Sequence, residues 1–323
     1  MMGLKFDLAG RAAHRGFIAV VAASIMAFAP ARAADPITYI IPFQAGGESD
    51  VTARLQEPVL KALGQDVVIQ YNPGAGGAKA WASLNKLKAD GSIIMGTNLP
   101  HIFLQPMQKD VGYKTEDLRH ISVFQLTPDA IIVPEDSPYK TLADLIAAAK
   151  ARPGAITLAG SGTNTGPHLT ATTFQKLADI KLTYVPFAGT APSIAAMLGK
   201  QVAAAMSFTT AAVQQGNKVR VLAVATDKRS EVLPDVPTFK ELGFDMVSGV
   251  FRGIAVPKST PEAKVKELSD LFAKVNQDAG FRKKMVQAGF QVVDVDAAKA
   301  PAFLAERGKE YEAAAREVGL LKK

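Results

Sequence analysis

Residues 42–50, Pro-Phe-Gln-Ala-Gly-Gly-Glu-Ser-Asp, have the composition of an anion-binding turn. The run at 37–43 is rich in Ile, Tyr and Phe and predicts a buried strand. Ser49 and Asp50 are helix-capping residues and Gly64 is a C-cap, so we expect a helix between them. A strand, a glycine turn and a helix start together present free backbone N–H groups to an anion. The alternative is a turn that only makes a tight connection.

A second glycine turn occupies residues 160–168, between a predicted strand at 156–159 and a predicted helix at 169–177. Its Gly160-x-Gly162-x-x-x-Gly166 spacing is one residue longer than the dinucleotide fingerprint. The next predicted strand, 182–187, has no acidic residue at its end to hold a ribose. Ser161 and His168 could form a hydrolase dyad with an aspartate, but ligand hydrogen bonding or capping is the interpretation that we favour.

Uncharged polar side chains recur where predicted strands end, which is where open α/β sheets bind ligands. Several N–H and O–H donors can hold a carboxylate by charge-assisted hydrogen bonds, without a buried Lys or Arg. Each residue taken singly is more simply a cap or turn former, so the prediction rests on their recurrence. They are Gln44, Ser49, Thr97, Asn98, Ser161, Thr163, Asn164, Thr190 and Ser207.

Signatures of catalysis are absent from the sequence. It has no G-x-x-x-x-G-K-[ST] loop, no G-x-S-x-G elbow and no cysteine, and its four histidines lack metal-ligand spacing. We predict a protein that is not an enzyme and that holds no metal and no cofactor.

The N-terminus predicts export. Lys5, Arg11 and Arg15 precede an apolar run at 16–29, and residues 31–33 read Ala-Arg-Ala, so we expect a signal peptide over 1–33, cleaved after Ala33. The chain carries 37 Lys and Arg against 30 Asp and Glu, and residues 1–33 hold four of the former and one of the latter, which leaves +4. This dispersed surplus predicts no nucleic-acid partner.

Strands and helices alternate along the rest of the chain, which predicts α/β architecture with parallel sheets. Residues 67–71, 92–97, 130–133 and 219–225 complete the predicted strands, and a helix is expected through residue 88 after the glycines at 74–77. Thr141 and Asp144 form a capping-box pair at the start of another helix. The length suggests two domains with glycine turns in both, as in a clamshell receptor.

Over essentially the whole exported sequence, the chain resembles the substrate-binding proteins of tripartite tricarboxylate transporters, the Bug receptors. Residues 42–54 match the family's P-[FYW]-x-x-G-G-x-x-D-x-x-A-R opening, and residues 73–77 match its second glycine motif. Residues 160–169, 185–192 and 222–243 are similar to its G-S-x-x-x-x-x-H-L, V-P-[YF]-x-G-x-x-P and L-A-V…R…P-D-V-P-T-x-x-E-x-G segments.

The resemblance implies a type II periplasmic-binding-protein fold, with two α/β domains, a two-crossing hinge and a ligand cleft between the domains. We expect the hinge crossings near Val133 and Gly253. Domain 1 would then comprise 34–133 and 253–323, and domain 2 would be the continuous insert 134–252.

It also implies a small carboxylate ligand gripped by loops of both domains. One side would contribute Phe43, Gln44, Ala45, Gly46, Gly47, Ser49 and Asp50, with Thr97 and Asn98. The other would contribute Ser161, Gly162, Thr163, Asn164, His168, Ala188, Gly189, Thr190, Ser207, Phe208 and Thr209. An alternative role for Asp50, at least equally favoured, is to hold the glycine turn by accepting backbone N–H bonds.

Departures from the family pattern concern charge. Tyr71 and Asn72 stand where Asn-Arg is usual, and Ala203 and residues 207–209 replace positions that often carry acids. We therefore hypothesise a mono- or dicarboxylate without an amino group, with an aromatic ligand as one option beside Phe43 and Phe208.

The function implied is that of a monomeric periplasmic receptor that delivers its carboxylate to the membrane permease subunits of a tripartite transporter. The alternative is a protein of the same fold that presents its ligand to a sensor kinase of a two-component system.

Overall fold

The computed structural model describes residues 35–321. The predicted signal peptide, 1–33, and its cleavage site lie outside these residues.

Within this range the strands are β1 (Ile37–Ile41), β2 (Val67–Tyr71), β3 (Ile93–Leu99), β4 (Leu118–Pro134), β5 (Thr157–Gly160), β6 (Thr183–Pro186), β7 (Ala204–Phe208), β8 (Val219–Val224), β9 (Gly249–Pro257) and β10 (Gln291–Asp296). The helices are α1 (Glu48–Ala62), α2 (Ala78–Trp81), α3 (His101–Gln108), α4 (Leu142–Ala151), α5 (Gly166–Ala178), α6 (Thr190–Leu198), α7 (Thr209–Gln215), α8 (Glu262–Gln277), α9 (Ala279–Gln287) and α10 (Ala300–Glu317). The predicted α/β class is confirmed.

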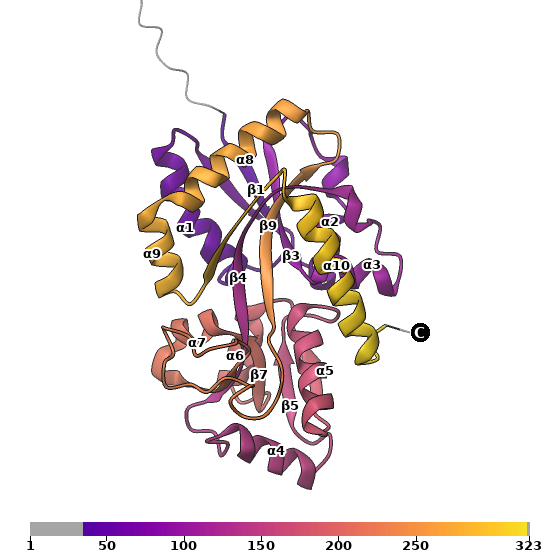
Figure 1. Cartoon of the computed structure of the whole chain (residues 1–323), viewed down its shortest axis with the longest axis vertical. Helices are drawn as coiled ribbons and strands as arrows, with labels where there is room; N and C mark the ends of the chain where they lie inside the picture. Colours follow the sequence, from indigo (N-terminus) through magenta and orange to yellow (C-terminus); the bar gives the residue numbers. More distant parts are fainter. Residues whose placement is uncertain (1–34, 322–323) are drawn as a thin grey trace, which may run out of the picture. The chain divides into compact units, whose positions relative to one another are not determined.

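The strands form two sheets that share β4, in the order β2-β1-β3-β9-β4-β7-β5-β6. β4 pairs with β9 as far as Pro128 and with β7 from Asp129 onward. β10 joins the first part of β4 and β8 joins the second. We call β2-β1-β3-β9 with β10 the first sheet and β7-β5-β6 with β8 the second sheet. Figure 1 shows β4 and β9 side by side where they pass from one set of helices to the other.

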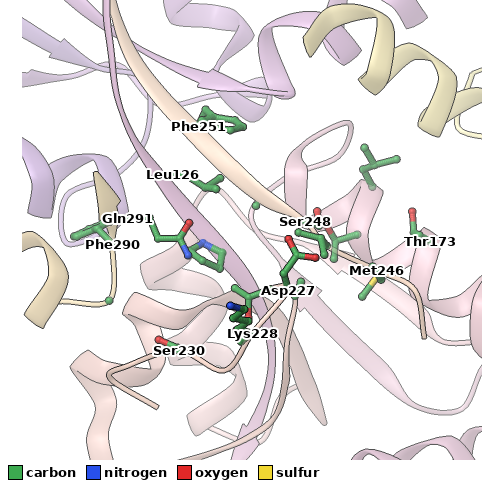
Figure 2. A pocket seen from close by; sticks show the side chains of 18 of the residues that line it. Leu126, Thr173, Asp227, Lys228, Ser230, Met246, Ser248, Phe251, Phe290 and Gln291 are labelled. Atoms are coloured by element: carbon green, nitrogen blue, oxygen red, sulfur yellow. Dashed lines mark hydrogen bonds between the residues drawn. The ribbon is translucent and has the colours of Figure 1, made fainter. Parts of the chain in front are cut away.

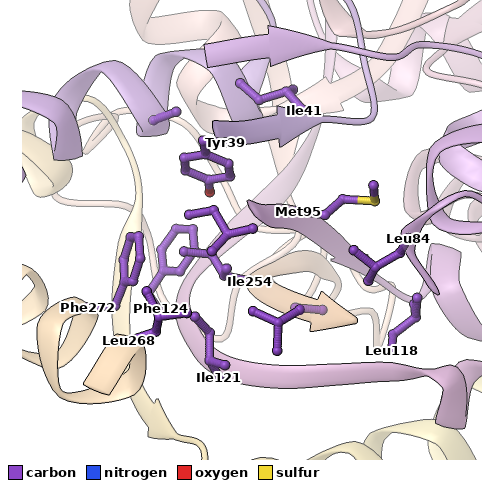
Figure 3. Close-up of a cluster of buried hydrophobic side chains, with 14 of the residues drawn as sticks. Tyr39, Ile41, Leu84, Met95, Leu118, Ile121, Phe124, Ile254, Leu268 and Phe272 are labelled. Atoms are coloured by element: carbon purple, nitrogen blue, oxygen red, sulfur yellow. The ribbon is translucent and has the colours of Figure 1, made fainter. Parts of the chain in front are cut away.

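Each sheet has its own apolar core. The core of the first sheet includes Tyr39, Met95 and Phe272, the last of these from α8 (Figure 3). One cluster on the second sheet contains Phe174 of α5, and another contains Ile194 of α6. A small further cluster of Leu104 of α3, Leu169 of α5, Ala315 of α10 and Leu321 joins helices of the two sheets. The relative position of the sheets therefore depends on this cluster as well as on β4, β9 and the loops between them.

The change of sheet on β4, at Pro128–Asp129, precedes the predicted crossing at Val133, and β9 begins at Gly249, ahead of the predicted crossing at Gly253. The boundaries of the two domains stay a prediction.

Local predictions had mixed outcomes. The capping box is confirmed, because the Thr141 hydroxyl accepts from the Asp144 backbone N–H and the Asp144 side chain accepts from the Thr141 N–H. The helix expected through residue 88 is wrong: α2 ends at Trp81, and only a 3₁₀ turn, Leu84–Lys86, follows.

Gly77 is the N-cap of this short helix, and its conformation makes a stability test possible. Its φ is +99°, and a Cβ placed there would lie 2.4 Å from the ring of Trp81, which is 1% exposed. Gly64 has a similar φ of +86° with nothing within 4 Å. Both glycines therefore avoid left-handed strain, but only Gly77 also makes room for a ring.

We expect Gly77→Ala to lower the free energy of unfolding by about 2–5 kcal/mol, because backbone strain and overpacking add. Gly64→Ala should cost only the backbone part, about 1–2 kcal/mol. Urea unfolding of both variants measures the difference, and equal losses would show that the Trp81 contact carries no cost.

Candidate ligand-binding site

The carboxylate of Asp50 stabilises the first glycine turn by accepting a hydrogen bond from its backbone. One of its carboxylate oxygens accepts the Gly46 backbone N–H at 2.7 Å. The other accepts the Tyr71 hydroxyl at 2.7 Å and lies 2.9 Å from Nε of Arg54. Because protein groups occupy both oxygens, the turn-holding role of Asp50 is the one that the geometry supports. Tyr71, a departure from the family pattern, contributes directly to it.

The start of α1 follows this turn and is largely buried. Its N-cap is Gly47, which has no side chain to accept from the first turn, and the first intrahelical bond runs from the Val51 N–H to the Gly47 carbonyl. The N–H groups of Glu48, Ser49 and Asp50 precede that bond, so they are the donors that a helix start offers to an anion.

His168 holds the second glycine turn in a similar way. Its Nδ1 accepts the Asn164 backbone N–H at 3.1 Å, and its ring lies 4.5 Å from that of Tyr184. The Tyr184 hydroxyl in turn donates to the Gly162 carbonyl at 2.8 Å. Burial lowers the pKa of His168, which favours the neutral ring that this bond requires. With Nδ1 accepting, the proton of the neutral ring is on Nε2, so His168 is not arranged as a base for Ser161.

The turns of the two sheets meet. A Cβ built on Gly46 would lie 3.7 Å from Cβ of Ala191, and one on Gly189 would lie 3.8 Å from the Gln44 nitrogen. Residues 43–46 and 188–191, both predicted site segments, are thus in contact.

Four hydrogen bonds also join segments of the first sheet to segments of the second sheet. Gln105 of α3 donates to the carbonyls of Thr163 and Asn164 at 2.8 and 3.2 Å. The Gly166 N–H donates to Nδ1 of His101 at 3.4 Å, and the Thr209 hydroxyl donates to the Gly289 carbonyl at 2.9 Å.

Other predicted site side chains face inward. The Phe43 ring packs edge-on against Trp81 and His101. The Thr97 hydroxyl lies 2.9 Å from Nε2 of His120, inside the first sheet. Asn98 and Ser207 are buried, and Asn98 Oδ1 and Ser207 Oγ have no hydrogen-bond partner among the described residues.

Arg252 was not identified from the sequence. It lies at the junction, by which we mean the region where β4 passes from the first sheet to the second. It is 3% exposed, lies on β9 between Asn98 of β3 and Gln125 of β4, and donates to the Thr127 hydroxyl at 2.5 Å. Its guanidinium carbon is 5.1 Å from the centre of the Phe208 ring. The sequence feature that could have identified this residue is a single arginine within the otherwise apolar run of β9. The sequence analysis expected donors other than a buried Lys or Arg, and that expectation stays a prediction.

Burial shifts the pKa values of the ionisable groups around Arg252. It raises the pKa of Asp129 to about 6, although hydroxyls of Thr170 and Ser248 donate to the carboxylate at 2.7 and 2.8 Å. It also raises the pKa of Glu48, against the opposing effects of Arg252 and Thr210. The pKa of His101 falls to about 3 because the ring is buried and Arg252 is near.

A separate cavity of about 780 Å³ lies beside β4 and β9 (Figure 2). Leu126 and Phe251 line it, whereas the next pair in register, Gln125 and Arg252, points to the other face because side chains alternate along a strand. None of the predicted site residues lines this cavity.

Residues 51–320 match the family model described as "Tripartite tricarboxylate transporter family receptor". This chain belongs to that family. A Cupriavidus necator protein, "UPF0065 protein in gbd 5'region", is 32% identical over 96% of this chain and 97% of its own length. The solved "Structure of periplasmic binding protein BugD" is 28% identical, covers 89% of this chain and 99% of its own, and superposes with a TM-score of 0.84.

The structure of "MatC" from Rhodopseudomonas palustris "with bound malate" is 23% identical, covers 86% of this chain and 98% of its own, and has a TM-score of 0.79, which shows the shared fold. The predicted family and the periplasmic-binding-protein fold are therefore confirmed. Over residues 35–321, no group of three or more His, Asp and Glu side chains is placed to hold a metal ion. None of the helices in this range is long and apolar enough to cross a membrane.

The raised pKa of Asp129 has a testable consequence for stability. The folded protein holds this proton more tightly than the unfolded chain, so the contribution of Asp129 is full below pH 3.8 and is lost as pH rises through about 6. Asp129→Asn keeps an acceptor for Thr170 and Ser248 without the buried charge. We expect the variant to be more stable than wild type by about 3 kcal/mol at pH 7.5 and similar to it at pH 4.

Chemical unfolding of both proteins at the two pH values measures this. A stability difference that does not change with pH would show that Asp129 titrates normally in the folded protein.

Proposed function

We propose that this protein is a periplasmic receptor that captures a small carboxylate between the first glycine turn on one side and residues 160–168 and 188–191 on the other. It delivers this ligand to the membrane permease subunits of a tripartite transporter. It is exported by cleavage after Ala33, acts as a monomer and is not an enzyme. The observation that carries the proposal is the meeting of the α1 start, residues 43–46 and residues 188–191 beside a buried arginine.

The chemistry of this junction favours an anion. Helix-start N–H groups and the Arg252 guanidinium are donors with positive charge or positive dipole ends. Asp50 and His168 each accept a backbone N–H of their own turn. We therefore assign them a role in fixing the turns and not in contacting the ligand. The malate bound to MatC, a relative in fold, fits the same class of ligand. An α-amino group is not part of the ligand that we propose.

We further propose two domains that move on β4 and β9, with 34–133 and 253–323 as domain 1 and 134–252 as domain 2. The contacts between the sheets are hydrogen bonds from loops and short helices together with one small apolar cluster that includes Leu104 and Leu169, whereas the main apolar core of each sheet stays within it. Such an arrangement lets the loops separate while the main cores stay buried, which is what hinge closure around a ligand needs.

The test is a thermal-shift screen of the purified exported protein against small mono- and dicarboxylates, with matched amines and sugars as controls. A ligand that binds only the folded state raises the melting temperature, and a hundredfold excess over Kd adds about 3 kcal/mol. Carboxylates alone should produce the shift. If none of them does so, with native mass spectrometry showing no co-purified ligand, the proposal is wrong.

Gln105 tests closure, because its side chain joins α3 to the second glycine turn. Gln105→Ala removes two hydrogen bonds to residues 163 and 164, each worth about 1 kcal/mol. We expect about thirtyfold weaker binding of any carboxylate found in the screen, with faster dissociation. The matched control is Gln65→Ala, because Gln65 also donates to two carbonyls but only at Asp35 and Asp66, within the first sheet.

Calorimetric titration and stopped-flow kinetics of both variants distinguish the outcomes. Equal affinities for the two variants would mean that the Gln105 contact does not belong to the ligand-bound state.

A further inference from the structure

Resting on the function proposed above, we infer that Arg252 binds a second carboxylate of the ligand, so that the receptor selects dicarboxylates over monocarboxylates of the same chain length. The argument depends on where the guanidinium lies, on what it lacks and on what surrounds it.

Arg252 lies where the first sheet meets the second. Asn98, Arg252 and Gln125 are in register on three adjacent strands, so their side chains share one face of the first sheet. On that face Thr52 of α1 donates to Gln125 at 2.7 Å, which places α1 over it. Phe208, the last residue of β7, brings the second sheet against the guanidinium.

The guanidinium is buried with part of its hydrogen-bonding capacity unused. Nη1 donates to Thr127, but Nε has no hydrogen-bond partner among the described residues. Arg252 also forms no ion pair within 4.0 Å over residues 35–321. A buried cation without a direct counter-charge costs several kcal/mol, and the planar fork of arginine matches a carboxylate.

Neighbouring polar atoms are also unpaired. Asn98 Oδ1 is buried without a hydrogen-bond partner in the part of the chain that the structure describes. Glu48, the first residue of α1, also has an unpaired oxygen and feels the charge of Arg252. The unpaired Nε therefore lies near the helix start that the proposed function assigns to the first carboxylate.

The two nearby acids do not take the place of the ligand. Asp129 accepts from Thr170 and Ser248 with one oxygen, and neither Asp129 nor Glu48 pairs directly with the guanidinium. Burial raises the pKa of both carboxyl groups. Because neither acid forms an ion pair with Arg252, its unpaired Nε is available to a carboxylate that enters between the turns.

The experiment compares dicarboxylates of three to six carbons, malate among them, with monocarboxylates of equal length, by calorimetric titration. Wild type should prefer the best dicarboxylate by at least a hundredfold. Arg252→Met, which keeps a long unbranched side chain, should lose about a hundredfold for that dicarboxylate and less than threefold for the monocarboxylate. Arg252→Lys keeps the charge without the fork and should lose about tenfold.

Arg282→Met is the matched control, because Arg282 pairs with Asp294 on the exposed surface, away from the junction. It should bind both ligand classes as wild type does. If Arg252→Met does not fold, Arg252→Lys decides by the same ratio.

Two failures can be told apart. A wild type that binds carboxylates while the Arg252 variants keep its dicarboxylate preference would overturn the role of Arg252 and leave the receptor function standing. A wild type that binds no carboxylate would overturn the function itself.

Discussion

The structure depends on one strand that belongs to two sheets. β4 pairs with β9 up to Pro128 and with β7 from Asp129. Because strands flank it on both sides there, its polar residues at the change of sheet, Gln125, Thr127 and Asp129, are buried. Buried polar groups need partners, so each one fixes another element to this point. Gln125 fixes α1 through Thr52, and Asp129 fixes α5 through Thr170. The first glycine turn, at the start of α1, is thereby placed relative to the change of sheet.

The two glycine turns have a common requirement. Backbone N–H groups can bind a ligand only if side chains elsewhere fix the conformation of the loop. In the first turn the carboxylate of Asp50 has this task, and in the second it is the neutral imidazole of His168. Both are residue types associated with catalysis, yet each uses an acceptor on the backbone of its turn. In the site that we propose, binding depends on main-chain donors whose positions these two side chains fix, which preorganises the site.

Much of this could be predicted from sequence because it is local. Glycines with a following cap predicted both turns, and the Thr141–Asp144 pair predicted a helix start. β4 was predicted only from residue 130, since Arg119, Gln125 and Asp129 interrupt the apolar pattern that marks a strand. Arg252 was missed for the related reason that its partners, Thr127 and Phe208, are distant in sequence. Which polar residues are buried depends on tertiary pairing, and a single sequence does not record that.

The contacts within each sheet differ in kind from the contacts between the two sheets. Each sheet has its own apolar cluster. The contacts between the two sheets combine neutral hydrogen bonds, each worth about 1 kcal/mol net, with the small apolar cluster of Leu104, Leu169, Ala315 and Leu321. Moving a two-state equilibrium from 1:99 to 99:1 takes about 5.5 kcal/mol. With the function proposed here, a ligand that bridges the turns and pairs with Arg252 adds to these contacts and so shifts the equilibrium toward the form in which the turns meet.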